Sequence, residues 1–160
     1  MTVPSTAAFR IHALPAETLD SVRASGVDVL GHRAERITAE GGEPLRCCLR
    51  DARPGDKLLL FGYQPPLPAG PYREVGAVLA HAEPCAGPAD IAGYPPDWRG
   101  RPQVLRAYDA RGRIHDATTV HDGQDPEKVI AELLAEPDVV QLHSRNIAWG
   151  CYMFAITRPD

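Results

Sequence analysis

Two adjacent cysteines between two arginines are the residues of this chain best suited to chemistry. In the stretch "EPLRCCLRDA", residues 43–52, Cys47 and Cys48 lie between Arg46 and Arg50. Side chains alternate between the two faces of a strand, so a strand here places Cys47 on an apolar row and Cys48 beside both guanidinium groups. We expect Cys47 to be a small buried hydrophobe and Cys48 to have a lowered pKa, because nearby positive charge favours the thiolate.

Polar residues recur with the same alternation on three further segments. Gln141, His143 and Arg145 share one side of residues 139–146, and Arg106 and Tyr108 share one side of residues 103–110. His81 occupies the equivalent row in the third segment, residues 76–82. If these rows meet, they form a cationic pocket that attracts an anion. The residues of this predicted pocket are Arg46, Cys48, Arg50, His81, Arg106, Tyr108, His143 and Arg145.

Three kinds of site are consistent with these residues. In the first, Cys48 is a catalytic nucleophile or redox thiol, with His143 or His81 as its base. In the second, the arginines and tyrosines bind a carboxylate- or phosphate-bearing ligand without chemistry. A phosphate loop followed by lysine, a GxSxG elbow and an HExxH motif are all absent from the sequence, so those reaction classes receive no support.

The third kind of site is a zinc or iron centre. His81 and Cys85 have an H-x3-C spacing that zinc accepts, with Cys48 or Cys151, and His143, as candidates for the further ligands. The chain has no CxxC motif. Two neighbouring cysteines on a regular strand point to opposite faces, so we do not expect Cys47 and Cys48 to reach the same ion.

Composition indicates one globular domain. The chain has 160 residues, of which 44% are hydrophobic and 24% charged. Its net charge of −4 argues against nucleic-acid binding, since phosphate backbones favour basic surfaces. No apolar run reaches the roughly 18 residues of a membrane span, and the first ten residues lack the pattern of a secretory signal. We therefore expect a cytoplasmic protein with reduced thiols, no membrane association and no disulfide framework.

Local signals predict an α+β domain with a largely antiparallel sheet and two main helices. Helices are expected over residues 15–26, from Pro15 to Gly26, and over residues 125–138, with Asp125 as N-cap and Pro137 as stop. Strands are expected within residues 9–14, 45–52, 56–64, 73–82, 103–110, 112–120, 139–146 and 151–157, the pair 103–110 and 112–120 forming a hairpin.

One connection is far longer than the rest. Residues 83–103 are rich in proline and glycine, and typical connections have roughly 4 to 6 residues. Such a segment is either a lid over a site or a packed surface excursion with Tyr94 and Trp98 held against the body of the protein. We expect it to cover part of the predicted pocket.

Four stretches of the chain resemble the DUF1203 family, a bacterial group without an assigned function. They are "LRCCLRDARPGDKLLLFGYQP", "YREVGAVLAH", "VLRAYDARGRI" and "HSRNIAWGCY", and the resemblance extends over about residues 9–158. One departure is Ala77, which stands where the family pattern has a proline. The positions that match the pattern are Cys48, Leu49, Arg50, Tyr72, Gly76, Arg106, Tyr108, His143, Asn146, Gly150, Cys151 and Tyr152.

The resemblance implies no reaction, but it adds Tyr72, Asn146 and Cys151 to the ligand-binding candidates. The sequence thus predicts small-molecule recognition of an anionic metabolite, with Cys48 and His143 as candidate catalytic residues. A non-catalytic binding module and a zinc-stabilised structural protein remain as alternatives. Neither a cofactor nor an oligomeric state follows from the residues.

Overall fold

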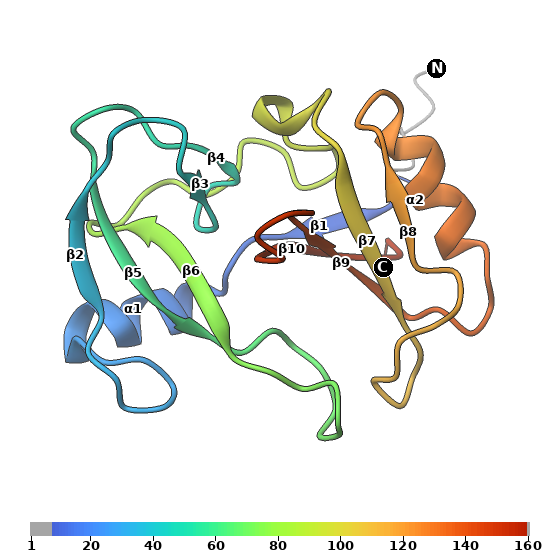
Figure 1. The fold of residues 1–160 in the computed structure, drawn as a ribbon, viewed down its shortest axis with the longest axis horizontal. Coiled ribbons are helices and arrows are strands. Elements are labelled where there is room, and N and C mark those ends of the chain that lie inside the picture. The colour runs from blue at the N-terminus through green and yellow to red at the C-terminus, as the bar shows by residue number, and fades with distance from the viewer. Residues whose placement is uncertain (1–7, 160) are drawn as a thin grey trace, which may run out of the picture.

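The computed structural model describes residues 8–159 and has an α+β fold built on two five-stranded sheets (Figure 1). The first sheet is antiparallel throughout, and its order is β1 (Arg10–His12), β10 (Tyr152–Thr157), β9 (Gln141–Arg145), β7 (Gln103–Tyr108) and β8 (Thr119–His121). The second has the order β2 (Glu35–Thr38), β5 (Lys57–Tyr63), β6 (Gly76–His81), β3 (Pro44–Leu45) and β4 (Arg50–Asp51). Within the second sheet, β3 pairs parallel to β6, and the other pairs are antiparallel.

Both predicted helices are confirmed at nearly the expected bounds. Helix α1 (Ala16–Ser25) follows Pro15 and ends at Gly26, whose φ of 73° is the left-handed conformation that glycine adopts without strain. Helix α2 (Pro126–Leu134) begins after Asp125, whose carboxylate accepts from the backbone N–H of Lys128. In Figure 1, α1 lies beside the sheet of β5 and β6, and α2 lies beside β8.

The prediction of one continuous strand over residues 45–52 is wrong. The chain makes only the short strands β3 and β4 there, and residues 46–49 form the turn between them. The backbone N–H of Leu49 donates to the carbonyl of Leu45 over 2.9 Å, which closes the turn. Leu49 has a φ of 56° and is the one residue other than glycine with positive φ in the described part of the chain.

The long connection after β6 is a packed excursion. Tyr94 and Trp98 are buried, and Trp98 lies in a short 3-10 helix, η1 (Pro96–Trp98). The Trp98 ring stacks on Phe154 of β10 at 5.8 Å, and its Nε1 donates to Asp51 of β4 over 3.0 Å. This segment therefore joins the two sheets, and its buried aromatic side chains fix it in place.

Three smaller differences separate the observed sheets from the expected strands. The strand β2 was not predicted. Of the strand expected over residues 112–120, only the end from Thr119 onward forms a strand, and it follows a turn closed by Gly112. The hairpin of β7 and β8 is confirmed by the pairing of Leu105 with Thr119. The single expected sheet is divided into two, and this division determines which polar residues meet.

The buried residues form two clusters. One cluster packs α1 against the second sheet and reaches Tyr152 and Ala155 of β10, so it lies between the sheets. The other packs α2 and residues 94–98 against the opposite face of the first sheet, around Phe154. Each face of the first sheet therefore has its own apolar layer, and β10 contributes to both.

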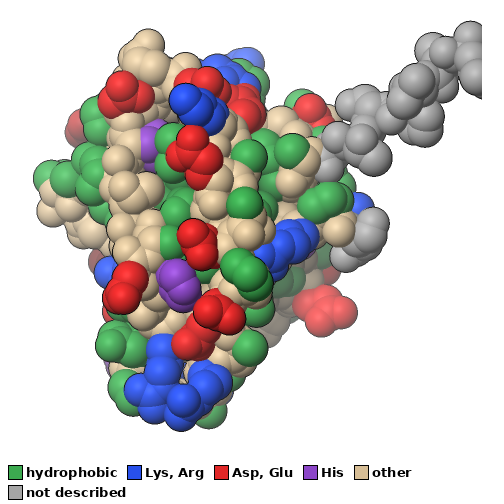
Figure 2. Space-filling view, turned by 90° about the vertical axis from the view of Figure 1, so that its right-hand side faces the viewer, with side chains coloured by type: hydrophobic (Ala, Val, Ile, Leu, Met, Phe, Trp, Pro, Cys, Tyr) green, Lys and Arg blue, Asp and Glu red, His purple; other side chains and the backbone are tan. Residues whose placement is uncertain are grey.

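On the outside, acidic side chains are spread over the face that Figure 2 shows, while lysine and arginine side chains gather mainly near its lower end. None of the helices within residues 8–159 has the length and apolarity needed to cross a bilayer. Residues 1–7, which carry most of the segment assessed for a secretory signal, are outside the described part of the chain.

Candidate functional site

The turn between β3 and β4 holds both cysteines over the end of β6. Parallel pairing of β3 with β6 sets Leu45 opposite Leu79, and the N–H of Arg46 donates to the carbonyl of Leu79 over 2.8 Å. Because residues 46–49 are a turn, the side chains of Cys47 and Cys48 do not alternate as they would on a strand. Their Sγ atoms lie 3.9 Å apart.

Four potential metal-ligating side chains meet at this turn. The sulfur atoms of Cys47, Cys48 and Cys85 and one ring nitrogen of His81 all lie within 4.8 Å of one another. All four cysteines of the chain are free thiols in the structure. Cys47 and Cys48 are buried, His81 is partly exposed and Cys85 is exposed, so the group has a solvent-facing side.

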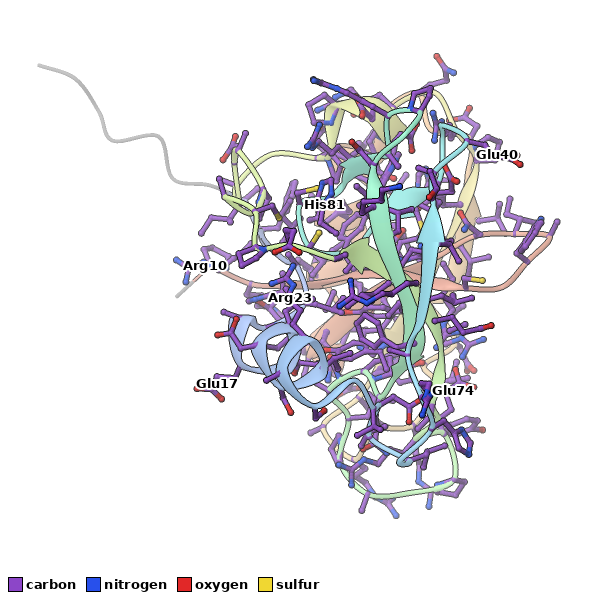
Figure 3. The ribbon with its side chains drawn as sticks, turned by 90° about the vertical axis from the view of Figure 1, so that its left-hand side faces the viewer. Arg10, Glu17, Arg23, Glu40, Glu74 and His81 are labelled. Atoms are coloured by element: carbon purple, nitrogen blue, oxygen red, sulfur yellow. The ribbon has the colours of Figure 1, made fainter. Side chains whose placement is uncertain are left out.

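The position of His81 is held by contacts with its backbone. Arg23 of α1 donates from Nε and Nη2 to the carbonyl oxygen of His81, at 3.3 and 3.0 Å, and from Nη2 to the carbonyl of Glu83 at 3.2 Å. The N–H of His81 donates to Sγ of Cys47 over 3.3 Å. Figure 3 shows Arg23 and His81 in this region, with sulfur atoms beside His81.

Arg50 places positive charge next to the thiols. Its Nη2 lies 3.3 Å from Nε2 of His81, and a guanidinium has no acceptor, so this imidazole nitrogen accepts the bond. Hydrogen bonds from Cys47 and Arg50, together with the electrostatic effects of His81 and Arg50, lower the pKa of Cys48 despite its burial. Donation to Cys48 and burial raise the pKa of Cys47. Of these two adjacent thiols, Cys48 is therefore the one that carries negative charge more easily.

Cys48 also faces a hollow of about 820 Å³ between the turn and the long connection. Arg50, Asp51 and Arg53 line one side of it, and residues between 87 and 99, among them Asp90, Asp97 and Arg99, line the other. Part of the expected arrangement is therefore present, since a hollow beside Cys48 is bordered by the segment predicted to cover it, but its lining carries aspartates as well as arginines.

A second polar cluster lies between the sheets, at β7, β9 and β10. His143 is fully buried, its ring contacting those of Tyr108 at 4.6 Å and Tyr152 at 5.2 Å. Its Nε2 lies 2.9 Å from Oε1 of Gln141, while its Nδ1 is buried with no partner among the described residues. Burial, together with Arg145 and Arg106, lowers the pKa of His143 to about 3, so the imidazole is neutral at physiological pH.

Two arginines of this cluster share one carboxylate. Glu74, in the loop before β6, bonds Nη2 of Arg145 and lies 3.4 Å from Nη1 of Arg106, both through its Oε1. Arg145 also donates to the carbonyl of Gly150 over 3.0 Å, and Arg106 donates to the hydroxyl of Tyr108 over 3.4 Å. The rows predicted for β7 and β9 thus meet, and the pairing of Arg106 with His143 places them side by side.

Arg46 points toward this second cluster and away from Cys48. Its Nε donates to the carbonyl of Tyr152 over 2.8 Å, and the side chain is buried. Burial lowers its pKa to about 10, an effect that the nearby sulfur of Cys151 partly opposes. Arg46 thereby ties the β3–β4 turn to β10 across the space between the sheets.

The structure does not bring Cys48 to His143. Among the described residues, no hydrogen bond, ion pair or ring contact joins the two, and the histidine beside Cys48 is His81. The expected common pocket is therefore divided. Cys48, Arg50 and His81 belong to the thiol cluster, whereas Arg46, Arg106, Tyr108, His143, Arg145 and Cys151 belong to the cluster between the sheets.

Two further candidates stand apart from both clusters. Asn146 shapes the β9–β10 hairpin, since its N–H donates to the carbonyl of Cys151 and its carbonyl accepts from Gly150. Tyr72 is exposed on the loop that carries Glu74. The described structure gives Tyr72 no hydrogen bond or ring contact with the other candidates.

Sequence reasoning missed Cys47 as a partner of Cys48, and it missed Glu74 and Tyr152 in the second cluster. The signal for Cys47 was its adjacency to Cys48, which is informative only if the segment turns. Tyr152 was a position matched by the family pattern, but no role was derived for it. Glu74 lies on an irregular loop and has no motif, so only the fold reveals its contacts.

Of three comparisons with known proteins, one identifies a family. No curated protein and no solved structure matches it. One family model, described as a protein of unknown function, matches residues 42–158, which include both polar clusters. The chain therefore belongs to the DUF1203 family.

Proposed function

We propose that this protein binds a zinc ion through Cys47, Cys48, His81 and Cys85. The observation that carries the proposal is the convergence of three sulfur atoms and one imidazole nitrogen within 4.8 Å of one another. Thiolate and imidazole are the ligands that zinc prefers, and a set of three cysteines and one histidine is a common composition of structural zinc sites.

The spacing of the donor atoms fits a tetrahedral site. With zinc–sulfur bonds of about 2.3 Å, two sulfur ligands of a tetrahedron lie roughly 3.8 Å apart. The Sγ atoms of Cys47 and Cys48 are already 3.9 Å apart, and the other donor atoms need to approach by at most roughly 1.3 Å. Cys85 lies in an irregular connection, which can make that adjustment.

The surroundings of the cluster suit a charged metal centre. Three thiolates and a neutral imidazole around a divalent ion leave one negative charge, which Arg50 offsets from its position beside Cys48. The N–H of His81 donates to Sγ of Cys47, and such outer contacts orient and stabilise ligating groups.

Four protein ligands leave no open position, so we infer a structural role for the zinc. The ligands come from the β3–β4 turn, the end of β6 and the connection after it. An ion held by all three segments would fix residues 83–103 to the second sheet at a second point, in addition to Trp98, their anchor in the core.

Metal analysis tests this proposal. Protein purified without added zinc should carry one equivalent, and cobalt substituted for zinc should give intense thiolate-to-cobalt absorption. The Cys85→Ser variant, altered at an exposed ligand, should bind the metal more weakly and show weaker thiolate absorption. Cys151→Ser is the matched control, since it removes a thiol outside the cluster. Metal-free wild-type protein that takes up no cobalt would contradict the proposal.

A second candidate function rests on the hollow next to Cys48. With His81 and Arg50 beside it, Cys48 in metal-free protein would be a reactive thiol facing a hollow that is lined by arginine and aspartate side chains alike, where Arg50 would hold an anionic group of a small metabolite next to the sulfur. Rapid alkylation of Cys48 by iodoacetamide, in protein that neither contains nor takes up zinc, would favour this function over the structural zinc site. Both candidates require reduced thiols, in keeping with a cytoplasmic bacterial protein.

A further inference from the structure

A small hollow lies beside the guanidinium groups of the second cluster. It has a volume of about 240 Å³, and Arg145, Glu74 and Tyr152 are among the residues that line it. Glu74 and Arg145 line this hollow and are bonded to each other, and the same Glu74 oxygen also reaches Arg106, which lies outside the lining. A carboxylate is thus already held between two arginines at the edge of a cavity.

The two partners of this ion pair differ in how firmly they are held. The Arg145 side chain is 10% exposed, lies on the central strand β9 and is anchored by the carbonyl of Gly150. The Glu74 side chain is 48% exposed and belongs to a loop without regular structure between β5 and β6. The cationic half of the pair is therefore built into the sheet, whereas the anionic half can move away at the cost of a few surface contacts.

The cluster also has more positive than negative charge. Two guanidinium groups share one oxygen of one carboxylate, and the buried Nε of Arg145 has no partner among the described residues. His143 is neutral and adds no charge, since burial and these arginines hold its pKa far below its usual range. A second negative charge would balance the site.

We propose that this hollow binds a small dicarboxylate through Arg145 and Arg106, and that the side chain of Glu74 takes the place of one ligand carboxylate when the site is empty. Two carboxylates match the two arginines in charge, and the planar guanidinium holds a carboxylate through paired hydrogen bonds. The proposal concerns a site different from the zinc cluster and does not depend on it.

The size and lining of the hollow limit the ligand. Its volume of about 240 Å³ lies below the roughly 300–1,000 Å³ of pockets for drug-sized molecules, so the ligand has few atoms. Beyond the charged end, the lining includes Pro65, Ala77 and Trp149. These apolar groups suit a short aliphatic chain between the carboxylates.

The two proposed sites lie at opposite ends of β6. Glu74 precedes the first residue of this strand, Gly76, and His81 is its last residue. At about 3.3 Å per residue, the five steps from Gly76 to His81 span roughly 17 Å. Figure 3 shows Glu74 and His81 separated accordingly, so a ligand at one site does not contact the other.

A built-in carboxylate competes with a free one. A group tethered by a short loop acts at an effective concentration in roughly the millimolar range, so it weakens the apparent affinity of any ligand that must displace it. Neutralising Glu74 should therefore strengthen binding of a free dicarboxylate at least tenfold, whereas neutralising an ordinary structural ion pair would leave binding unchanged.

Isothermal titration with malonate tests the proposal. We expect wild-type protein to bind malonate weakly and Glu74→Gln to bind it at least tenfold more tightly. Glu127→Gln is the matched control, because Glu127 also pairs with an arginine, Arg99, on a distant surface, and its loss changes the net charge equally. This control should bind malonate as the wild type does.

Variants of the arginines complete the test. Arg106→Lys, in the Glu74→Gln background, should lose most of the gained affinity, and its side chain is exposed enough, at 29%, for the variant to fold. Equal malonate binding by wild type and Glu74→Gln, or no binding by either, would show that the ion pair only joins the loop to the sheet. Equal affinity for sulfate at matched ionic strength would assign the site to anions in general and overturn the dicarboxylate assignment.

Discussion

The Sγ atoms of Cys47 and Cys48 lie 3.9 Å apart on the turn between β3 and β4. Adjacent residues of a strand point to opposite faces, so this proximity depends on the turn. The conformation of this turn depends on Leu49, whose backbone has a φ of 56° and whose side chain is buried in the core around Phe154. Burial of Leu49 offsets a backbone conformation that leucine rarely adopts.

Removal of metal should lower the thermal stability of the wild-type protein. A ligand that binds only the folded state stabilises it by RT ln(1 + [L]/Kd), which is about 4 kcal/mol when free zinc exceeds Kd a thousandfold. Differential scanning calorimetry before and after dialysis against a chelator should show a fall in Tm that added zinc reverses.

Two cysteine variants make that experiment specific. Cys151→Ser should keep the response to chelator, since Cys151 lies outside the thiol cluster, whereas Cys85→Ser should lose most of it. A wild-type Tm that is the same with chelator and with added zinc would contradict a structural zinc site.

The buried His143 should make the protein less stable as the pH falls. Its pKa is lowered to about 3 in the folded protein by burial, Arg145 and Arg106, and is about 6.5 in the unfolded chain. Between these values the unfolded chain binds a proton that the folded protein does not, so stability falls by roughly 1.4 kcal/mol per pH unit as the pH drops below about 6.5.

Urea unfolding at pH 7 and pH 5 measures this effect. The loss of stability between the two should be roughly 2 kcal/mol smaller in His143→Gln than in wild type. Burial raises the pKa of the neighbouring Tyr152, so this tyrosine does not obscure the difference. In wild-type protein, NMR signals of the His143 ring should show no titration from pH 8 to pH 4.5. A ring that protonates near pH 6 would refute the assignment.

Gly123 should tolerate alanine far less well than Gly26 does. Both have positive φ, at 84° and 73°, but a Cβ at Gly123 would lie 2.4 Å from the backbone nitrogen of Arg101, while a Cβ at Gly26 meets nothing within 4 Å. We expect Gly26→Ala to cost about 1 kcal/mol and Gly123→Ala at least about 2 kcal/mol more. Chemical unfolding of both variants is the measurement, and equal losses would be inconsistent with this close approach.

Substitution of the two tryptophans should affect the stability of the protein to very different degrees. Trp98 is fully buried, stacked on Phe154 and bonded to Asp51, whereas Trp149 is 86% exposed. Trp98→Phe should destabilise the protein by about 1–3 kcal/mol, and Trp149→Phe should change its stability by less than about 0.5 kcal/mol. Acrylamide should quench the fluorescence of Trp98→Phe strongly and that of Trp149→Phe weakly; the reverse order would refute the packing of residues 83–103.

Much of the fold follows from local signals in the sequence. Asp125 and Pro126 begin α2, and Pro15 and Gly26 delimit α1, because caps and breakers act within one helical turn. Alternation along β7 and β9 correctly grouped Arg106 and His143 on one face, because the period of two is a property of any strand. The class of fold, the helices and one of the two polar rows were therefore open to prediction.

The thiol cluster required the tertiary structure. Residues 45–52 have the alternation of a strand, and only the burial of Leu49 and the parallel pairing of Leu45 with Leu79 turn the chain there. That pairing joins segments 34 residues apart and brings His81 to Cys48. No local pattern predicts whether His81 or His143 lies beside Cys48, because long-range strand pairing determines it.

The sequence by itself thus determined both helices, most of the strands, the family and the kinds of side chain available for chemistry. Tertiary structure alone decided that these side chains form two sites, by dividing the strands between two sheets and by setting Glu74 against Arg145. The physical reason is one of range: capping and alternation act between near neighbours in the chain, whereas burial and strand pairing select among partners that the chain brings together only when it folds.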